Sequence, residues 1–351
     1  MAGSGQRVRK ALALLGAVAC IAAGAAETPP ALHLRIVGGL ASLKVFTQHE
    51  KPFWETELAR LSGGRYTAEI APFDRAGIRS QEALTLVQLG AVPFATVQVS
   101  GGIKDPELSA PDLSGLNPDM ATLRRSLAAF RPYLEEVMRK RYGIEVLAVY
   151  AYPAQVLFCK KPLAGLKDVA GLRVRTSGPA QADLIEALGG KAVTTGFNDI
   201  VPYLTRDEID CAVTGTMSGN IIGLPDITST LHPMAISWGL SMFAANGAAW
   251  NALPADLRAL LKRELPRVER EVWDESEFDT ADGIACNIGA PSCKGGQRGH
   301  MVAVPASAAD ERLRREIFAT TVLPRWVQRC GPQCAATWNR TLAHSAGVEA
   351  R

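Results

Sequence analysis

Stretches with the two-residue period of a β-strand alternate with amphipathic helical stretches along most of this chain. Residues 31–39, 66–73 and 92–100 have strand character, and the amphipathic stretches 51–64 and 80–90 separate them. Consecutive strands that are joined by helices run parallel, with the helices on the faces of the sheet. The order therefore predicts an α/β fold with a largely parallel sheet.

A second α/β unit and one unusually long helix are predicted further along the chain. The second unit begins near residue 152, and residues 253–285 keep helical spacing through Pro266, where we expect a kink. At about 1.5 Å per residue, such a helix spans roughly 45 Å, which is more than one domain needs. We therefore expect this helix to bridge two lobes.

The N-terminal residues have the layout of a secretory signal peptide. Arg7, Arg9 and Lys10 precede the apolar run 11–23, and small residues follow it, so residues 1–26 are predicted to be removed on export. Cys20 offers an alternative as a lipid-anchoring cysteine. This alternative is disfavoured because the position three residues earlier is alanine, where such sites usually have leucine.

The charge balance excludes an extended nucleic-acid surface. Removing residues 1–26 takes away three basic side chains and leaves 35 Lys and Arg against 35 Asp and Glu. Phosphate binding needs clustered basic residues, and no such cluster is present in the sequence. Any anion site in the mature chain must therefore be local.

Cysteine usage favours disulfides. Outside the signal peptide the chain has six cysteines, and an even number in an exported protein suggests pairing. Short sequence spacing predicts the pairs Cys286–Cys293 and Cys330–Cys334.

The other two cysteines, Cys159 and Cys211, lie in apolar strand-like runs. We expect both to be small buried thiols, because free cysteine behaves as a small hydrophobic residue. Zinc binding by the C-terminal pair is disfavoured, since His300 and His344 do not complete a ligand set at a recognised spacing. No metal site is predicted.

The common catalytic motifs are absent from the sequence. The segment GTMSG (215–219) has its serine one place too late for a nucleophile elbow, and no zinc-protease, phosphate-loop or dinucleotide motif occurs. A Ser-His-Asp site assembled from distant residues remains the enzyme alternative. No catalytic residue and no cofactor is predicted.

A strand that ends in arginine carries the strongest functional signal. In GLRVRTSGPAQADLIEALGG (171–190), Arg173 and Arg175 share one side of a strand, and Pro179 then opens an apolar helix. From alternation alone, Arg175 is equally compatible with an ion pair to a neighbouring acid and with a ligand contact.

Residues 144–264 resemble the solute-binding receptors of TRAP (tripartite ATP-independent periplasmic) transporters, the type that captures carboxylates. The residues that carry the resemblance are KDVAGLRVRT, EALGGKAVTTGFNDIVPYL, DEIDCAVTG and WNALPADLRALLKREL. The resemblance implies a two-lobed periplasmic-binding-protein fold of the type II kind, with an interlobe cleft, crossing strands and a long interlobe helix. The expected lobes are 27–151 with 240–280, and 152–239 with 281–351.

The resemblance also implies a role for Arg175. In that family the second arginine of this strand ends in the cleft and pairs bidentately with the ligand carboxylate. A guanidinium suits this task, because its planar fork matches a carboxylate. Arg173, two residues earlier, is expected to face solvent or to be paired.

Other candidate ligand contacts follow from the same comparison of motifs. Phe197 matches an aromatic residue that packs on the bound ligand, although a core position is equally compatible. Thr214 stands where many relatives have asparagine, and Gln155 stands where some have a second arginine. The missing second arginine argues against a strongly dianionic ligand.

Four further residues are predicted at or near the cleft. Gln98 falls near a position used for polar contacts, and Thr216 and Asn220 follow the 211–215 strand into a helix start, where backbone N–H groups attract anions. Helix capping is an equal alternative for Thr216. Trp238 lies at the expected interlobe crossing, where it could line the cleft or pack in the core.

The predicted function is capture of a small carboxylate by lobe closure in the periplasm, followed by delivery to TRAP membrane permease subunits. The receptor is expected to be a monomer that binds no nucleic acid. The alternatives are a solute-binding protein of an ATP-driven importer or of a sensor, and the unrecognised periplasmic hydrolase.

Overall fold

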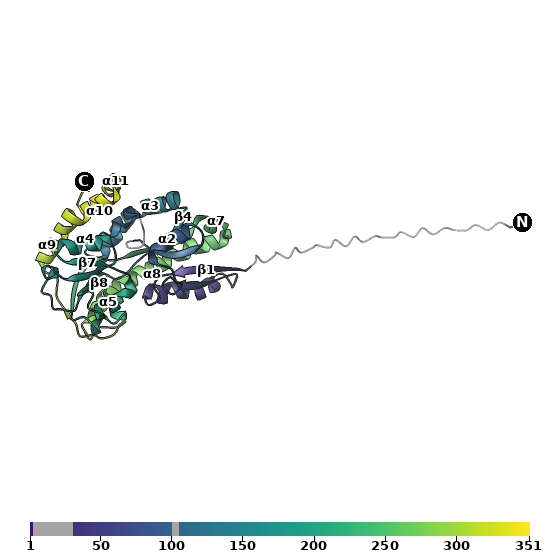
Figure 1. The fold of residues 1–351 in the computed structure, drawn as a ribbon. Coiled ribbons are helices and arrows are strands. Elements are labelled where there is room, and N and C mark those ends of the chain that lie inside the picture. Colours follow the sequence, from purple (N-terminus) through teal and green to yellow (C-terminus); the bar gives the residue numbers. More distant parts are fainter. Residues whose placement is uncertain (3–30, 100–104) are drawn as a thin grey trace. The chain divides into compact units, whose positions relative to one another are not determined.

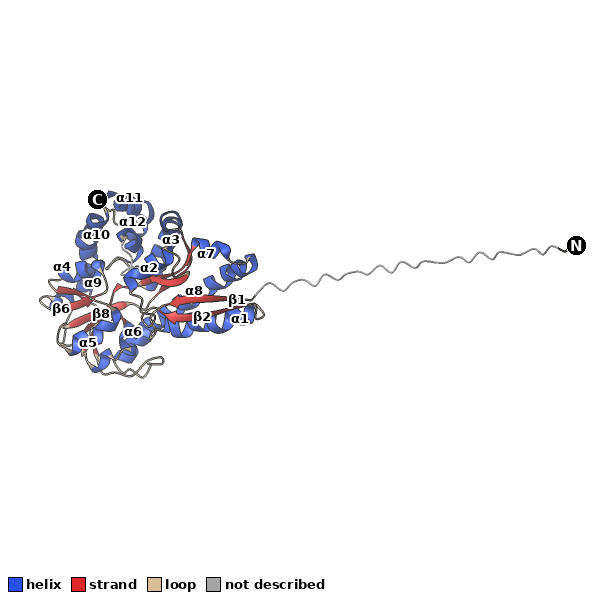
Figure 2. Ribbon diagram, turned by 45° about the vertical axis from the view of Figure 1, so that its right-hand side comes forward, coloured by secondary structure: helices blue, strands red, loops and turns tan. Residues whose placement is uncertain are grey.

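The computed structural model describes residues 1–2, 31–99 and 105–351. Residues 3–26 of the predicted signal peptide, including Cys20, lie outside the described residues. Two sheets flanked by helices organise residues 31–351, as Figures 1 and 2 show. The mixed α/β architecture confirms the predicted fold class.

The first sheet has the strand order β2-β1-β3-β10-β4. Strands β1, β2 and β3 are parallel, and β10 runs antiparallel to both of its neighbours. The predicted parallel arrangement therefore holds for every described strand of this sheet except β10. The strand bounds are β1 Leu32–Gly38, β2 Tyr66–Pro72, β3 Phe94–Gln98, β4 Ile144–Ala151 and β10 Leu240–Asn246.

The second sheet has the strand order β11-β9-β5-β8-β6-β7. Strands β6, β7 and β8 are parallel, β9 and β11 are parallel, and β5 runs antiparallel to β8 and β9. The bounds are β5 Gln155–Cys159, β6 Arg173–Thr176, β7 Lys191–Thr194, β8 Cys211–Gly215, β9 Thr230–Ser237 and β11 Val302–Ala303.

The helices cover the faces of these sheets (Figure 2). They are α1 Leu58–Leu61, α2 Ser80–Gln88, α3 Met120–Tyr142, α4 Pro179–Ala187, α5 Ile200–Thr205, α6 Thr216–Ile221, α7 Gly247–Ala252, α8 Ala255–Asn287, α9 Ala308–Ile317, α10 Leu323–Cys330, α11 Pro332–Thr341 and α12 Ala343–Ala346. Short π-helical segments are η1 Val45–Glu50, η2 Phe53–Glu57 and η7 Phe318–Val322. Short 3₁₀-helical segments are η3 Pro106–Asp112, η4 Leu166–Val169, η5 Phe197–Asp199 and η6 Leu224–Asp226.

Two short connections carry the chain between the sheets. Residues 152–154 join β4 of the first sheet to β5 of the second, and residues 238–239 join β9 back to β10. The second connection is held by Asp112 at the end of η3, whose carboxylate accepts from Trp238 N at 3.0 Å and Gly239 N at 2.7 Å. Burial raises the pKa of Asp112 to about 7, although these two hydrogen bonds oppose the shift.

The predicted long helix is α8, and Pro266 lies within it. It contacts both sheets: Trp273 donates to Val149 O of β4, and Thr280 Oγ1 accepts from Ala154 N just before β5. At Gly283 the backbones of α8 and α6 come so close that an added Cβ would lie 2.4 Å from Met217 N. The absence of a side chain at this position is therefore required for the contact between the two helices.

All six cysteines of the described chain are paired. The disulfides Cys286–Cys293 and Cys330–Cys334 agree with the prediction. The prediction of free thiols at Cys159 and Cys211 was wrong, because these residues also form a disulfide. They face each other across the antiparallel strands β5 and β8. Lys160 N donates to Asp210 O at the next position, which places the cysteines at a narrow, non-hydrogen-bonded pair.

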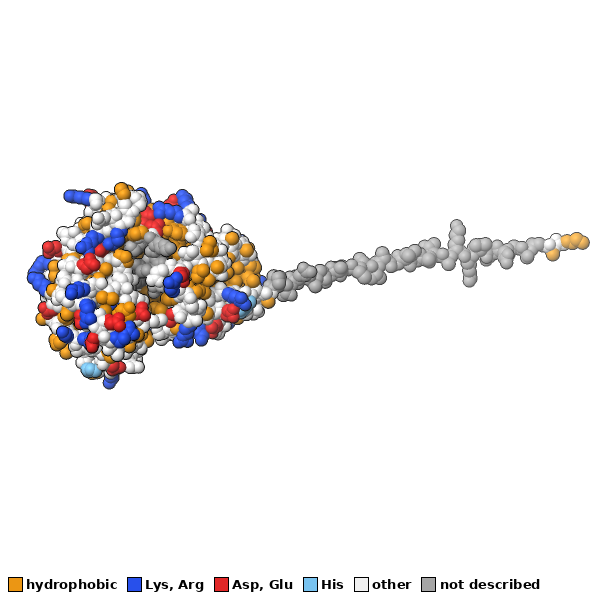
Figure 3. All heavy atoms as spheres, in the orientation of Figure 1, with side chains coloured by type: hydrophobic (Ala, Val, Ile, Leu, Met, Phe, Trp, Pro, Cys, Tyr) orange, Lys and Arg blue, Asp and Glu red, His pale blue; other side chains and the backbone are white. Residues whose placement is uncertain are grey.

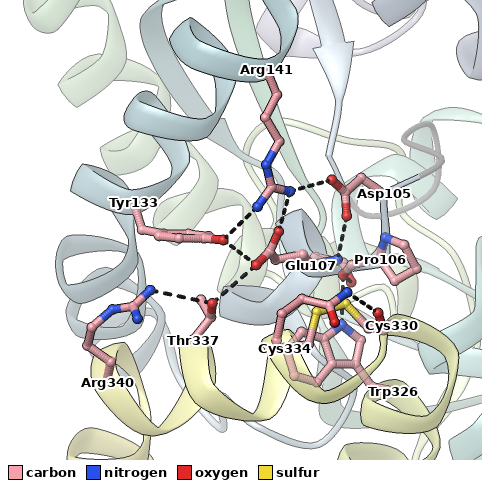
Figure 4. The surroundings of a disulfide bond; sticks show 12 residues. Asp105, Pro106, Glu107, Tyr133, Arg141, Trp326, Cys330, Cys334, Thr337 and Arg340 are labelled. Carbon is pink, nitrogen blue, oxygen red and sulfur yellow. Dashed lines mark hydrogen bonds and ion pairs between the residues drawn. A yellow bond between two sulfur atoms is a disulfide. The ribbon is translucent and has the colours of Figure 1, made fainter.

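The C-terminal disulfide lies beside a buried carboxylate that ties several elements together (Figure 4). Glu107 of η3 is 2% exposed and accepts from Arg141 Nη1 at 2.7 Å, from Thr337 Oγ1 at 3.1 Å and from the Tyr133 hydroxyl. Trp326 of α10 donates to Pro106 O. The segment η3 is thus fixed to α3, α10 and α11.

A further buried carboxylate lies beneath the first sheet, and none of the ion pairs among the described residues involves it. Glu50 of η1 is fully buried; it accepts from Gly39 N at 2.8 Å and from the Thr96 hydroxyl. Burial raises the pKa of Glu50 from 4.5 to about 7. Between pH 4.5 and about 7, Glu50 is therefore protonated in the folded chain and ionised in the unfolded chain.

The raised pKa of Glu50 predicts the direction in which its replacement changes the free energy of unfolding. This group stabilises the fold fully below pH 4.5, and its contribution is lost as the pH rises towards about 7. In the Glu50→Gln variant the side chain is uncharged. Its carbonyl oxygen can still accept from Gly39 N, and its amide N–H can donate to the Thr96 hydroxyl oxygen. We expect it to match the parent at low pH and to exceed it by about 3 kcal/mol above pH 7, as measured by urea unfolding.

The matched control is Glu107→Gln, because Glu107 is equally buried but is paired with Arg141. Removing that charge breaks the ion pair of Glu107 with Arg141, which keeps only its ion pair with Asp105 Oδ2 at 3.2 Å among the described residues, so this variant is expected to be less stable at neutral pH. A Glu50→Gln variant that loses stability at every pH would contradict the assignment of a desolvated acid.

Candidate functional site

A cleft of about 570 Å³ lies where the parallel strands of both sheets end. The carboxyl ends of parallel strands are a common place for ligand sites. The residues that line the cleft at these strand ends are Leu40 and Leu43 after β1, Phe73 and Asp74 after β2, Gln98 at the end of β3, Ser177 after β6, Thr195 and Phe197 after β7, and Thr214 and Gly215 at the end of β8.

Arg175, from β6, is the buried cation of this cleft. Only 4% of the residue is exposed, and its guanidinium donates to Val213 O at 2.8 Å and to Thr195 O through Nε at 3.2 Å and Nη2 at 3.0 Å. No carboxylate of the described residues forms an ion pair with it. The alternative of an internal ion pair is therefore not what the structure contains.

The hydrogen bonds of Arg175 leave part of its fork unused. A guanidinium has five N–H donors, and the two carbonyls occupy one on each of its three nitrogens. One N–H on each terminal nitrogen remains, so the guanidinium can still donate two hydrogen bonds to a carboxylate. Burial lowers the pKa of Arg175 to about 10, and the charge of Asp199 opposes this shift, so the side chain stays cationic at neutral pH.

Arg173 differs from Arg175 in every respect that matters for binding. It is two residues earlier on β6, and its guanidinium forms an ion pair with Asp210, whose Oδ1 lies 2.8 Å from Nη2. Its side chain is 40% exposed and does not line the cleft. Arg173 is thus a paired surface residue, as predicted.

Four further predicted residues lie in the cleft wall with Arg175: Gln98, Gln155, Phe197 and Thr214. The Gln155 amide is fixed in place, since Nε2 donates to Trp238 O at 3.1 Å and Oε1 accepts from Gln181 Nε2 at 2.8 Å. The Gln98 carbonyl oxygen accepts from Ser80 Oγ at 2.7 Å. The structure therefore brings together five of the eight predicted ligand residues.

The other three predicted ligand residues point elsewhere. The strand β8 ends at Gly215, and in the helix that follows Thr216 and Asn220 share the face towards α8. Thr216 Oγ1 donates to Asp279 O, and Asn220 Nδ2 donates to Gln297 O. Ser218, on the other face of α6, lines the cleft instead.

Trp238 packs in the core instead of lining the cleft. It is 2% exposed, and its indole N–H donates to Asn117 O at 3.0 Å. Its neighbour Gly239 does line the cleft, with φ +83°, and an added Cβ there would lie 2.6 Å from Gln155 Nε2. The connection formed by residues 238–239 therefore contributes backbone atoms to the cleft wall.

Sequence reasoning missed most of the wall that the first sheet supplies. This wall is mainly apolar, with Leu40, Leu43, Phe73, Ile78 and Leu240, and it also holds Asp74, Ser80 and Tyr152. The rule that ligands bind beyond the carboxyl ends of parallel strands could have identified Leu40 and Phe73, because each follows a predicted strand.

A family comparison gives this geometry a context. The sequence profile of DctP, described as bacterial extracellular solute-binding protein, family 7, matches residues 44–284. The matched range covers more than half of the chain and includes Arg175. The chain belongs to this family.

Solved structures with the same fold can be aligned with most of this family 7 protein. The Bordetella pertussis extracytoplasmic solute receptor DctP7, which binds pyroglutamic acid, superposes with a TM-score of 0.78 at 19% identity, covering 88% of this chain and 99% of the receptor. A TRAP periplasmic solute-binding protein from Desulfovibrio salexigens with bound orotic acid gives 0.75 at 16% identity, covering 90% and 98%. At these identities the likeness establishes the two-lobed fold.

A third structure is the TRAP periplasmic solute-binding protein from Shewanella oneidensis with bound succinate. It superposes with a TM-score of 0.72 at 18% identity, and the alignment covers 88% of this chain and 98% of that protein.

Within residues 1–2, 31–99 and 105–351 of the family 7 protein, no helix has both the length and the apolarity that crossing a membrane requires. Basic and acidic side chains are intermixed on the face that Figure 3 shows.

Proposed function

We propose that this solute-binding protein captures a small organic acid through its carboxylate and delivers it to the membrane subunits of a TRAP transporter. The observation that carries the proposal is Arg175, a buried guanidinium in a cleft with no described carboxylate partner and with a free N–H on each terminal nitrogen. A buried charge without a partner is unfavourable, so a site of this kind favours binding of an anion.

The cleft walls suggest how capture proceeds. Ligand contacts would come from the ends of strands in both sheets, so a bound acid links the lobe around the first sheet to the lobe around the second. Asn198 Nδ2 already donates to Asp74 Oδ2 across the cleft at 3.5 Å. Lobe closure around the ligand would exclude water and strengthen the charge-assisted hydrogen bonds to Arg175.

Delivery to a TRAP permease is proposed from the family and its relatives. The described relatives include TRAP periplasmic receptors with orotic acid and succinate, and a receptor for pyroglutamic acid. All three ligands are carboxylic acids, which agrees with a cleft built around one arginine. We also propose that the receptor is periplasmic, acts as a monomer and has no catalytic role.

A thermal-shift screen against a panel of organic acids tests this function. An acid present at a hundred times its dissociation constant is expected to stabilise the protein by about 2.7 kcal/mol. The matched controls are the neutral amides of the same acids, which should give no shift because they lack the charge that Arg175 needs.

Two outcomes would contradict the proposed function. The first is that no acid stabilises the protein while a neutral amide or sugar does. The second is that the bound acid is recovered chemically altered, which would favour the hydrolase alternative. Recovery of the unchanged acid after denaturation supports a receptor.

A further inference from the structure

The charges in the cleft wall are few and unevenly placed. Arg175 is the buried cation, and the other lining arginine, Arg79, has a side chain that is 78% exposed and is paired with Glu82. The lining acids are Asp74 and Asp199. Among the described lining residues, the cleft thus has two cations and two acids, and of the two cations only Arg175 is buried.

The wall opposite Arg175 offers no buried cation for a second anion among its described residues. It presents five aliphatic or aromatic side chains, and its polar groups Gln98 and Ser80 are uncharged. The charges on this side are Arg79, which is exposed and paired with Glu82, and Asp74, whose Oδ1 accepts from Ala41 N at 3.0 Å. A second carboxylate on the ligand would meet either apolar side chains or this like charge, and both are unfavourable.

We propose that the cleft is specific for monocarboxylates with an apolar body and discriminates against dicarboxylates. This inference rests on the proposed function, because it assumes that Arg175 binds the ligand carboxylate. The apolar body would pack on Leu40, Leu43 and Phe73 of the first sheet and on Phe197 of η5. Gln155, held between Trp238 O and Gln181, is a neutral group of the cleft wall and adds no second cation.

The test compares acids that differ only in the second charge. The pairs are hexanoate with adipate, pentanoate with glutarate, and benzoate with terephthalate, each titrated by calorimetry. In every pair that binds, the monocarboxylate is expected to have a dissociation constant at least tenfold lower. Equal or tighter binding of the dicarboxylates overturns the inference.

The outcomes separate this inference from the function on which it rests. If no acid binds in these pairs or in the wider screen, the proposed function fails. If only acids outside these pairs bind, the number of carboxylates on the tightest binder decides: one supports monocarboxylate specificity, and two overturns it.

A variant of Asp74 tests the cause of the discrimination. Asp74→Asn removes the negative charge and keeps an oxygen for Ala41 N, so the preference for the monocarboxylate of a pair should fall at least threefold. The control is Asp168→Asn, which removes a charge outside the cleft wall and keeps an acceptor for Ala164 N. An unchanged preference in Asp74→Asn, or an equal change in the control, overturns the role given to Asp74.

Discussion

Replacing Arg175 with alanine is expected to weaken binding of the organic acid at least tenfold. Two charge-assisted hydrogen bonds to a carboxylate are lost, and each contributes roughly 1.5 to 3 kcal/mol. The fold is expected to persist, because among the described residues the side chain donates hydrogen bonds only to the carbonyls Val213 O and Thr195 O. Calorimetry with the tightest acid from the screen measures the loss, and circular dichroism checks the fold.

Two companion variants make this result specific. Arg175→Lys keeps the charge but not the planar fork, so its affinity should fall between those of the parent and the alanine variant. Arg173→Ala removes an identical side chain from the same strand, where it is paired with Asp210 and lies outside the cleft. It should leave the affinity within twofold of the parent. Unchanged binding by Arg175→Ala would refute the proposed site.

Replacing both Cys159 and Cys211 with alanine is expected to lower the free energy of unfolding by about 4 kcal/mol. The disulfide closes a loop with a sequence separation of 52, so its loss gives the unfolded chain considerable conformational freedom. Both residues are completely buried, and the alanines also leave unfilled space in the core. Urea unfolding of the oxidised proteins gives the difference.

The Cys330→Ala/Cys334→Ala double variant is the matched control. Its disulfide has a sequence separation of only 4, and the same chain-entropy argument predicts a loss of about 2 kcal/mol. Peptide mapping of the unreduced protein checks the pairing directly. Free thiols at Cys159 and Cys211, or a double variant as stable as the parent, would contradict this assignment.

Sequence periodicity was sufficient to predict the fold class and the long helix, because both depend on local patterns. Strands such as 31–39 and 66–73 appear in the structure as β1 and β2, with bounds that differ by only one residue. The position of Arg175 in the cleft was predicted from the resemblance to TRAP receptors, and it agrees with the rule that clefts form at the carboxyl ends of parallel strands.

The errors arose where the answer depends on contacts between distant segments. The pairing of Cys159 with Cys211 follows from the register between β5 and β8, which neither segment encodes alone. Thr216 and Asn220 were misplaced because the orientation of α6 is set by its packing on α8 at Gly283. Periodicity identifies which residues share a face but not which neighbour that face meets.

The attachment of Asp112 has a mechanical consequence for any motion between the two sheets. The two N–H groups of the 238–239 connection donate to different oxygens of one carboxylate, so the connection is held at two points. The carboxylate itself is anchored, because η3 is fixed to α3, α10 and α11 through Glu107 and Pro106. The β9–β10 connection is therefore tied through η3 to α3 and to the C-terminal helices, and a motion between the sheets would have to leave this attachment in place or break it.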